Sequence, residues 1–451
     1  MMRTLWSAVL AAGLMASAAM LAPATAEVTA APATINDIDG DGLLDVVYSW
    51  GGNGSDEDNG ILTVSYGDGE EQSFIGQQGF GYPLPDPPIH DRSFGRSTEV
   101  ADLNGDQYAD VVVAGRGLGS SHGYLFIALG SADGLTLDRI ERVEIPFSGE
   151  YAGLTVVTEP EPLIVVSSPD AVVGGLASGA LYAIPVTPAG EALPGALISQ
   201  NSAGIPGNNE NGDRFGASID AEGSTLVVGS PDEDTTKADE TGMIHVLRRN
   251  GSTLSFAGVG FHQDTADVPG SAEDGDAFGE SVAIEDGHIA VGLPGEDIGT
   301  VADAGMVVYF ADDGTTTTVA GAFNQGSPGI PGSNEARDLF GQSVGFTRPC
   351  PGQHAILVGA AEFSDDSLRT TVVNLDAAAS CTNKLLGGDA VAARHNTAPN
   401  QADSVIVAEP AELYYDDPTA VERRYPYTSV VREWGEGDVD GGLHLVEPMS
   451  S

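Results

Sequence analysis

Short apolar runs alternate with polar turns along most of this chain, at lengths typical of β-strands. Leu226–Val228 is continuously apolar and lies between a turn at 220–224 and an acidic loop at 232–241, and a further run follows at 242–247. Continuous apolar runs of this length predict strands buried on both faces. Because few helical patterns interrupt the runs, we predict an all-β protein.

The same order of runs returns at a fixed interval, marked by Phe-Gly pairs. Phe215-Gly216, Phe278-Gly279 and Phe340-Gly341 lie 63 and 62 residues apart, and looser copies bring the expected units to seven. An interval of this length predicts stacked or ring-arranged copies of one supersecondary unit. We therefore predict a seven-bladed β-propeller of four-stranded antiparallel blades over 27–451. A linear β-solenoid is the alternative, although its coils are usually shorter.

The strands at both chain ends and the outer strands are marked least clearly. The first unit is expected to use 33–35, 46–49 and 60–66, and the last unit 389–393, 404–410 and 441–446. Fourth strands should follow third strands, around 253–259 and 315–320. The last unit then lacks an outer strand, which residues 27–33 could supply, so that both chain ends would share one blade.

The first 26 residues are typical of a secretory signal peptide. Arg3 precedes an apolar stretch from Leu5 to Leu21, and an Ala-x-Ala cleavage site ends at Ala26. A membrane anchor is the alternative, but no later segment reaches the roughly 18 apolar residues that span a bilayer. We expect an exported protein without membrane insertion. In an oxidising environment Cys350 and Cys381 can form a disulfide, with two buried thiols as the alternative.

The chain is strongly acidic, with 66 Asp and Glu against 18 Lys and Arg and a formal net charge of −48. Such a surface repels nucleic acid and anionic lipid, so we expect neither as a partner. The charge fits either a high-salt habitat, in which salt screens self-repulsion, or ordinary acidic drift. We expect a monomer whose partner is an extracellular protein or glycan.

Two nine-residue loops carry the strongest chemical signal. Each places oxygen-bearing side chains at positions 1, 3, 5 and 9, offers a backbone carbonyl at position 7, and precedes an apolar run. The expected metal ligands are Asp37, Asp39, Asp41, Leu43 and Asp45 in the first loop, and Asp102, Asn104, Asp106, Tyr108 and Asp110 in the second. Such sets suit Ca²⁺, which takes about 6–8 oxygen ligands, and carboxylates this close repel one another without a cation. We expect one or two structural Ca²⁺ ions, with empty acidic turns as the alternative.

The repeated motifs resemble the FG-GAP repeats of the integrin alpha-chain N-terminal propeller and its bacterial relatives. Residues 215–216 with Gly-Ser-Pro at 229–231, and 278–279 with Gly-Leu-Pro at 292–294, match the motif, whereas 340–341 pairs with the degenerate Gly-Ala-Ala at 359–361. The resemblance covers nearly the whole chain after residue 26. It implies a propeller whose calcium loops lie between the first and second strands of a blade. The family includes both binding and enzyme-associated proteins, so the resemblance does not select a function.

The first loop matches the family pattern completely, whereas Gln107 in the second loop stands where glycine is usual. If that position needs a positive φ, glutamine costs about 1 kcal/mol there. The corresponding turns of later units, 220–224 and 285–287, are too short to enclose a metal in the same way, so we expect no equivalent ion in them.

Catalytic motifs are scarce. Residues 119–123 fit Gly-x-Ser-x-Gly, but a strand-like run follows where a nucleophile elbow needs a helix. His245 and His288 lie in expected strands and are assigned packing or hydrogen-bonding roles. We therefore assign no catalytic residue.

A ligand is expected at the loops opposite the metal loops, as in the family. These loops gather acidic and amide residues, with a merely solvated rim as the alternative: Asn208, Asn209, Glu210, Asp213, Asp232, Glu233, Asp234, Asp239, Glu240, Asp274, Asp276, Glu296, Asp297 and Asp303. We expect a secreted calcium-binding module for binding or scaffolding. The alternative is a polysaccharide- or ester-directed hydrolase or lyase, whose cleft would bring together two acids, or an acid and a histidine, with perturbed pKa values.

Overall fold

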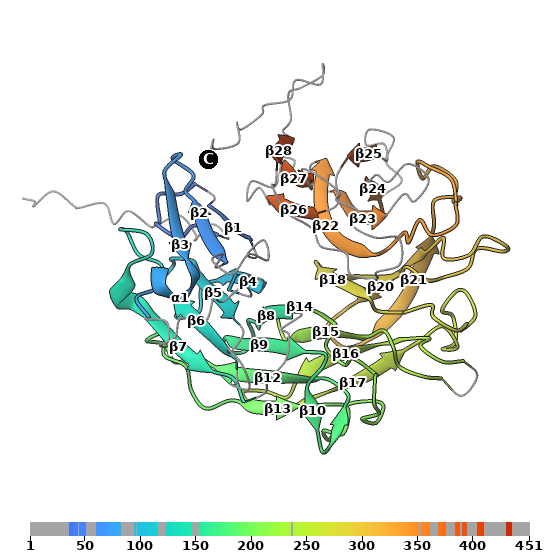
Figure 1. Cartoon of the computed structure of the whole chain (residues 1–451), viewed down its shortest axis with the longest axis horizontal. Helices are drawn as coiled ribbons and strands as arrows, with labels where there is room; N and C mark the ends of the chain where they lie inside the picture. The colour runs from blue at the N-terminus through green and yellow to red at the C-terminus, as the bar shows by residue number, and fades with distance from the viewer. Residues whose placement is uncertain are drawn as a thin grey trace, which may run out of the picture. The chain divides into compact units, whose positions relative to one another are not determined.

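The computed structural model describes residues 36–43, 45–50, 60–82, 94–95, 97–115, 123–146, 153–235, 238–350, 353–360, 369–375, 384–387, 390–394, 404–409 and 430–434. All of them belong to the second of the two units into which the chain divides, Ala33–Ser451. Their regular structure is almost entirely β-strand (Figure 1). The helices among them are single turns, α1 (Gly76–Gly79) and the 3₁₀ turn η1 (Leu137–Arg139).

The described strands form seven antiparallel sheets in chain order. The first sheet contains β1 (Val46–Trp50), β2 (Ile61–Ser65) and β3 (Glu71–Ile75), and the second β4 (Ser97–Ala101), β5 (Asp110–Gly115), β6 (Tyr124–Ala128) and β7 (Ile140–Glu144). The third contains β8 (Gly153–Val157), β9 (Leu163–Ser168), β12 (Ala180–Pro185) and β13 (Ala196–Ile198), with a small ribbon of β10 (Val172–Val173) and β11 (Leu176–Ala177) between β9 and β12. The fourth contains β14 (Ser218–Glu222), β15 (Thr225–Ser230), β16 (Met243–Arg249) and β17 (Phe256–Phe261), and the fifth β18 (Ser281–Glu285), β19 (His288–Leu293), β20 (Met306–Asp312) and β21 (Thr317–Phe323). The sixth contains β22 (Ser343–Cys350), β23 (Gln353–Ala360), β24 (Arg369–Asn374) and β25 (Lys384–Gly387), and the last β26 (Ala390–Arg394), β27 (Ser404–Glu409) and β28 (Val430–Trp434).

The sheets are arranged as the blades of a β-propeller. Each complete sheet pairs four strands in chain order, and the first strands of successive sheets lie against one another: β4 against β8, β8 against β14, β14 against β18, β18 against β22 and β22 against β26. The predicted all-β fold of four-stranded antiparallel blades is confirmed, and the number of described sheets agrees with the seven expected units.

Second strands lie in the interior, as their apolar composition predicts. Every residue of β5, β9 and β15 is buried. Apolar clusters fill the space between neighbouring sheets, so that Val227 of β15 packs in one cluster with Ile289 and Val291 of β19. Since burial of apolar surface contributes about 25 cal/mol per Å², these inter-sheet layers supply most of the cohesion of the fold.

The Phe-Gly pairs fasten one sheet to the next. The Phe278 ring is fully buried, and its backbone forms a parallel bridge to Gly242, the residue before β16 in the preceding sheet. Gly279 has a φ of +92° and donates its amide to the Gly292 carbonyl at 3.0 Å. Phe215 and Phe340 make the same bridges, to Gly179 and Gly305. The period of the sequence is therefore the period of this junction, and only glycine tolerates its backbone geometry.

A further Phe-Gly pair, not among those predicted to mark the units, lies before the second sheet. Phe94 is fully buried, Gly95 has a φ of +81°, and the Gly95 amide donates to the Ala114 carbonyl at 3.2 Å. The motif thus marks the entry to the second sheet as it does the fourth, fifth and sixth.

The outer strands β17 and β21 confirm the predicted fourth strands within a few residues. The third strand of the last sheet is β28, earlier in the chain than the expected 441–446, which lies outside the described residues. β1 and β2 correspond to the second and third predicted strands of the first unit, since the loop at 37–45 immediately precedes β1. The expected first strand at 33–35, the signal peptide, Cys381 and residues 119–122 also lie outside the described part. No helix in the described part is long and apolar enough to span a bilayer.

Candidate metal centre

The first predicted metal loop is held by its own carboxylates. Asp37 accepts hydrogen bonds from the amides of Gly40 at 2.7 Å and Gly42 at 3.0 Å. Asp45 accepts from Ile38 at 2.6 Å and from Gly67, beyond β2, at 2.9 Å. Asp37 and Asp45 are buried, so the loop is fixed to the sheet at both ends.

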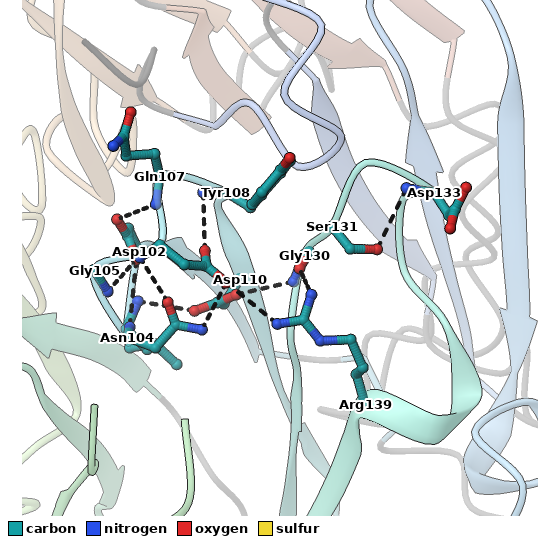
Figure 2. Close-up of polar contacts among 12 residues, drawn as sticks. Asp102, Asn104, Gly105, Gln107, Tyr108, Asp110, Gly130, Ser131, Asp133 and Arg139 are labelled. Carbon is teal, nitrogen blue, oxygen red and sulfur yellow. Dashed lines mark hydrogen bonds and ion pairs between the residues drawn. The ribbon is translucent and has the colours of Figure 1, made fainter. Parts of the chain in front are cut away.

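The second loop repeats these contacts position by position (Figure 2). Asp102 accepts from the amides of Gly105 at 2.7 Å and Gln107 at 3.1 Å. Asp110 accepts from Leu103 and from Gly130, beyond β6, both at 2.9 Å. Identical spacing therefore produces identical turns in two sheets, with the ninth-position carboxylate on the first residue of β5 in the second case.

The middle ligands also follow one pattern. Asp39 and Asp41 accept from the amides two residues later, at 3.1 and 2.7 Å, and Asn104 and Asp106 do the same at 2.8 and 3.1 Å. Each of these bonds uses one side-chain oxygen, which leaves further lone pairs available to a cation.

The sixth position has a left-handed backbone in both loops. Gly42 has a φ of +85° and Gln107 a φ of +75°. Gln107 therefore does occupy a position with positive φ. A non-glycine residue in this conformation costs about 1 kcal/mol of stability.

Three carboxylates of the first loop converge. Oxygen atoms of Asp37, Asp39 and Asp45 lie within 4.8 Å of one another. Burial, with smaller contributions from the neighbouring carboxylates, raises the pKa of Asp45 to about 6, and burial likewise raises the pKa of Asp39. Negative charges gathered this closely away from water are the electrostatic setting that a bound Ca²⁺ would relieve, and the donor set fits that ion.

The second loop differs in its electrostatics. The Arg139 guanidinium lies 3.2 Å from Asp106 and also donates to the Gly130 carbonyl, so a cationic side chain already faces one expected ligand. Burial raises the pKa of Asp110 to about 7. At the three positions that converge in the first loop, the second loop has two carboxylates, Asp102 and Asp110, and the neutral amide of Asn104. The first loop is therefore the better cation site.

The two loops contact each other. The Ala109 amide donates to the Asp37 carbonyl at 2.8 Å, and Ser131, beyond β6, donates to the Ile38 carbonyl at 3.1 Å. Sequence reasoning placed each loop in its own unit and did not foresee this contact. Each loop therefore supports the backbone of the other.

Two acids of the expected ligand face are buried in the connections between sheets. Asp213 and Asp276 are at most 3% exposed and accept the amides of Glu210 and Glu273, each at 2.6 Å. Burial raises the pKa of both aspartates to about 6. Both residues lie in connections between sheets, as predicted, and their carboxyls hold the backbone of those connections.

Two glutamates of the same face are joined to buried glutamines. Gln200 donates to Glu233 at 2.6 Å, and Gln263 donates to Glu296 at 2.5 Å. Burial raises the pKa of Glu233 and of Glu296 to about 7. In each pair the glutamine follows the outer strand of one sheet, and the glutamate lies in the loop between the second and third strands of the next. The equal spacing of Gln200 and Gln263 along the sequence could have indicated this repeated hydrogen bond.

First strands carry a separate set of carboxyl groups. Asp220 of β14 accepts the Ile284 amide of β18 at 2.8 Å, which covers a free strand edge in the next sheet. Burial, with the Asp220 charge as the next contribution, raises the pKa of Glu99 on β4 to about 8, and burial raises that of Asp220 to about 7. The charge of Asp220 on β14 therefore contributes to the raised pKa of Glu99 on β4.

His245 has the packing role that was expected. It is fully buried, its ring lies 5.0 Å from that of Phe215, and its Nε2 lies 3.1 Å from the Ser230 hydroxyl. Burial lowers its pKa to about 3, so it stays neutral.

No family model matches the chain, and no curated protein matches it. Among solved structures, a protein from Lactobacillus plantarum is similar at 9% identity and a TM-score of 0.46, covering 90% of this chain and 96% of that one. The periplasmic gluconolactonase of Pseudomonas aeruginosa is similar at 14% identity and a TM-score of 0.46, covering 89% and 95%. The Dos1 propeller is similar at 12% identity and a TM-score of 0.43, covering 90% and 88%.

Proposed function

We propose that this chain is an exported, calcium-binding β-propeller of the FG-GAP type that acts as an extracellular binding or scaffold module. The observation that carries the proposal is the shared hydrogen-bond pattern of the loops at 37–45 and 102–110, together with the convergence of Asp37, Asp39 and Asp45. The predicted signal peptide and the acidic composition support export and a cationic ligand.

Calcium is assigned a structural role. The carboxylates that would hold it also hold the turns, through hydrogen bonds to Gly40, Gly42 and Ile38. An ion would neutralise the repulsion within each loop and fix the entry to the following strand, which couples metal binding to folding. Because the loops share backbone contacts, occupancy of the first should support the second.

The test is thermal unfolding of the mature protein in EDTA and in millimolar Ca²⁺. An ion at 100 times its Kd stabilises by about 2.7 kcal/mol, which corresponds to roughly 3 °C for a unit of this size. Asp39→Ala should remove most of the calcium-dependent increase, because Asp39 is a converging ligand whose own hydrogen bond is solvent-accessible. Asp133→Ala, an exposed acid in the turn after β6, should keep it. A wild-type melting temperature that is the same in EDTA and in calcium would exclude the structural ion.

A hydrolase or lyase remains the second candidate because of Glu99 and Asp220. These carboxyls lie on β4 and β14 and have pKa values of about 8 and about 7, as an acid–base pair requires. Turnover of polysaccharide or ester substrates that is lost in both Glu99→Gln and Asp220→Asn would select this candidate. Binding on a glycan and protein array without turnover, retained in both variants, would select the binding module.

A further inference from the structure

The hairpin between β18 and β19 carries carboxyl side chains at a turn for which the sequence predicts no ion. Glu285 ends β18 and pairs directly with His288, which begins β19. The two residues between them, Asp286 and Gly287, have φ values of +47° and +71°. Positive φ at both central residues is typical of a type I′ turn, for which Asp-Gly is a preferred sequence. The turn is tight, so its acids hold fixed positions.

A histidine from the neighbouring sheet completes the group. His354 lies near the start of β23, 68 residues later, and its Nε2 is 2.8 Å from an Asp286 carboxylate oxygen. Ligand atoms of Glu285, Asp286 and His354 all lie within 4.8 Å of one another. The group therefore spans two sheets, with two donors on the β18–β19 hairpin and the third on β23 of the next sheet.

A second histidine supports the imidazole. The His288 ring lies 5.0 Å from the His354 ring at an interplanar angle of 30°, and its Nδ1 is buried with no hydrogen-bond partner among the described residues. The stacked ring limits how far His354 can rotate.

The carboxylates around the hairpin concentrate negative charge there. Glu222 of β14 accepts the amides of Asp286 at 2.7 Å and Gly287 at 2.9 Å, which fixes the turn from the opposite side. Three carboxylates thus surround a single turn. An imidazole together with carboxylates suits Zn²⁺ and related transition-metal ions, whereas Ca²⁺ prefers oxygen ligands alone.

We propose that Glu285, Asp286 and His354 bind one divalent transition-metal ion, with Zn²⁺ as the matching ion, and that this ion links the fifth and sixth sheets. The His354 Nε2 lone pair and one oxygen from each carboxylate are the protein ligands, and water occupies the remaining position. On binding, the metal replaces the His354–Asp286 hydrogen bond, and any proton on Nε2 leaves or moves to Nδ1. The site is separate from the calcium loops and does not depend on the function proposed above.

The test is isothermal titration of the metal-free mature protein with ZnCl₂, in saturating Ca²⁺ at neutral pH. We expect one equivalent of zinc that excess calcium does not displace. His354→Gln and Glu285→Gln should each lower the zinc affinity by about 10- to 100-fold or more, since even residues that only support metal ligands have effects of that size. Two matched controls should retain it: His262→Gln, a histidine in the loop after β17, and Asp39→Ala in the first calcium loop.

Absence of zinc binding by the folded wild-type protein would overturn the proposal, as would unchanged affinity in His354→Gln. Should a variant fail to fold, X-ray absorption at the zinc edge of the wild-type protein decides the question. Imidazole scattering is expected in the zinc spectrum, and a spectrum with oxygen ligands only would refute the assignment of His354.

Discussion

Glu99→Gln should stabilise the protein at alkaline pH and have little effect at acidic pH. Burial raises the pKa of Glu99 from 4.5 to about 8 on folding. Between those values the unfolded chain is ionised while the folded protein holds the proton, so stability decreases as the pH rises from 4.5 to 8. Glutamine has the shape of the protonated glutamate side chain but does not ionise. The variant therefore does not lose stability as the pH rises.

The size of the effect follows from the difference between the two pKa values. At about 1.36 kcal/mol for each pKa step, the upper bound is roughly 5 kcal/mol. Water reaches the partly exposed Glu99 and screens its charge, so we expect roughly half, about 2–3 kcal/mol. With an unfolding entropy of ~2.1 cal/mol/K per residue, a unit of this length gains about 3 °C.

The assay is calorimetric or fluorimetric melting of wild type and variant at pH 4.5 and pH 8.5, at one ionic strength and with calcium present. Glu191→Gln, an exposed glutamate in the loop between β12 and β13, controls for the loss of one negative charge from a very acidic chain. The reasoning is refuted if Glu99→Gln raises the melting temperature equally at both pH values. It is also refuted if the control shows the same pH-dependent gain.

Three further predictions concern the junctions and the loops. Gly242→Ala should cost about 3–4 kcal/mol, because its Cβ would lie 2.3 Å from the Phe278 nitrogen, whereas Gly251→Ala, also at positive φ but in open space, should cost about 1 kcal/mol; equal denaturation midpoints would contradict this account of the junction. Gly42→Gln and Gln107→Gly should change the melting temperature in opposite directions and by similar, small amounts, because the left-handed strain of about 1 kcal/mol is partly offset by the freedom of glycine in the unfolded chain; changes in the same direction would show that this strain does not set the effect. Calcium affinity of the first loop should fall about fourfold between pH 7.5 and pH 5.5 as protons compete for Asp45, whose pKa is about 6; titration calorimetry that finds a constant affinity would exclude Asp45 as a ligand.

Much of the fold could be predicted because each unit repeats a local pattern. An apolar run such as Leu226–Val228 needs no distant partner to be recognised as an interior strand, and Phe278-Gly279 marks the junction that sets the period. The weakest predictions concerned the chain ends, where the third strand of the last sheet is β28 rather than 441–446. That unit lacks a Phe-Gly pair, so no local motif indicated where its strands begin.

The turns of the two acidic loops were predictable for the same local reason. Asp37 reaches the amides of Gly40 and Gly42 within its own turn, so the spacing of the acids already contains the geometry. Sequence could not show that Arg139 would face Asp106, because the two are 33 residues apart and meet only when β7 packs beside β6. Sequence also could not show that Asp213 is buried, because acids at the surface and acids in the junctions occur in loops of similar amino-acid composition.

The sequence by itself determined the all-β propeller and the two loops with calcium spacing, because hydrogen bonds and apolar contacts within one unit depend on residues close in the chain. Tertiary structure alone decided which unit contributes to which site. It set His354 beside Asp286, coupled Glu99 to Asp220 and joined the first loop to the second through Ala109 and Asp37. These contacts cross between sheets, and their electrostatics depend on burial and separation in space, which spacing along the chain does not specify.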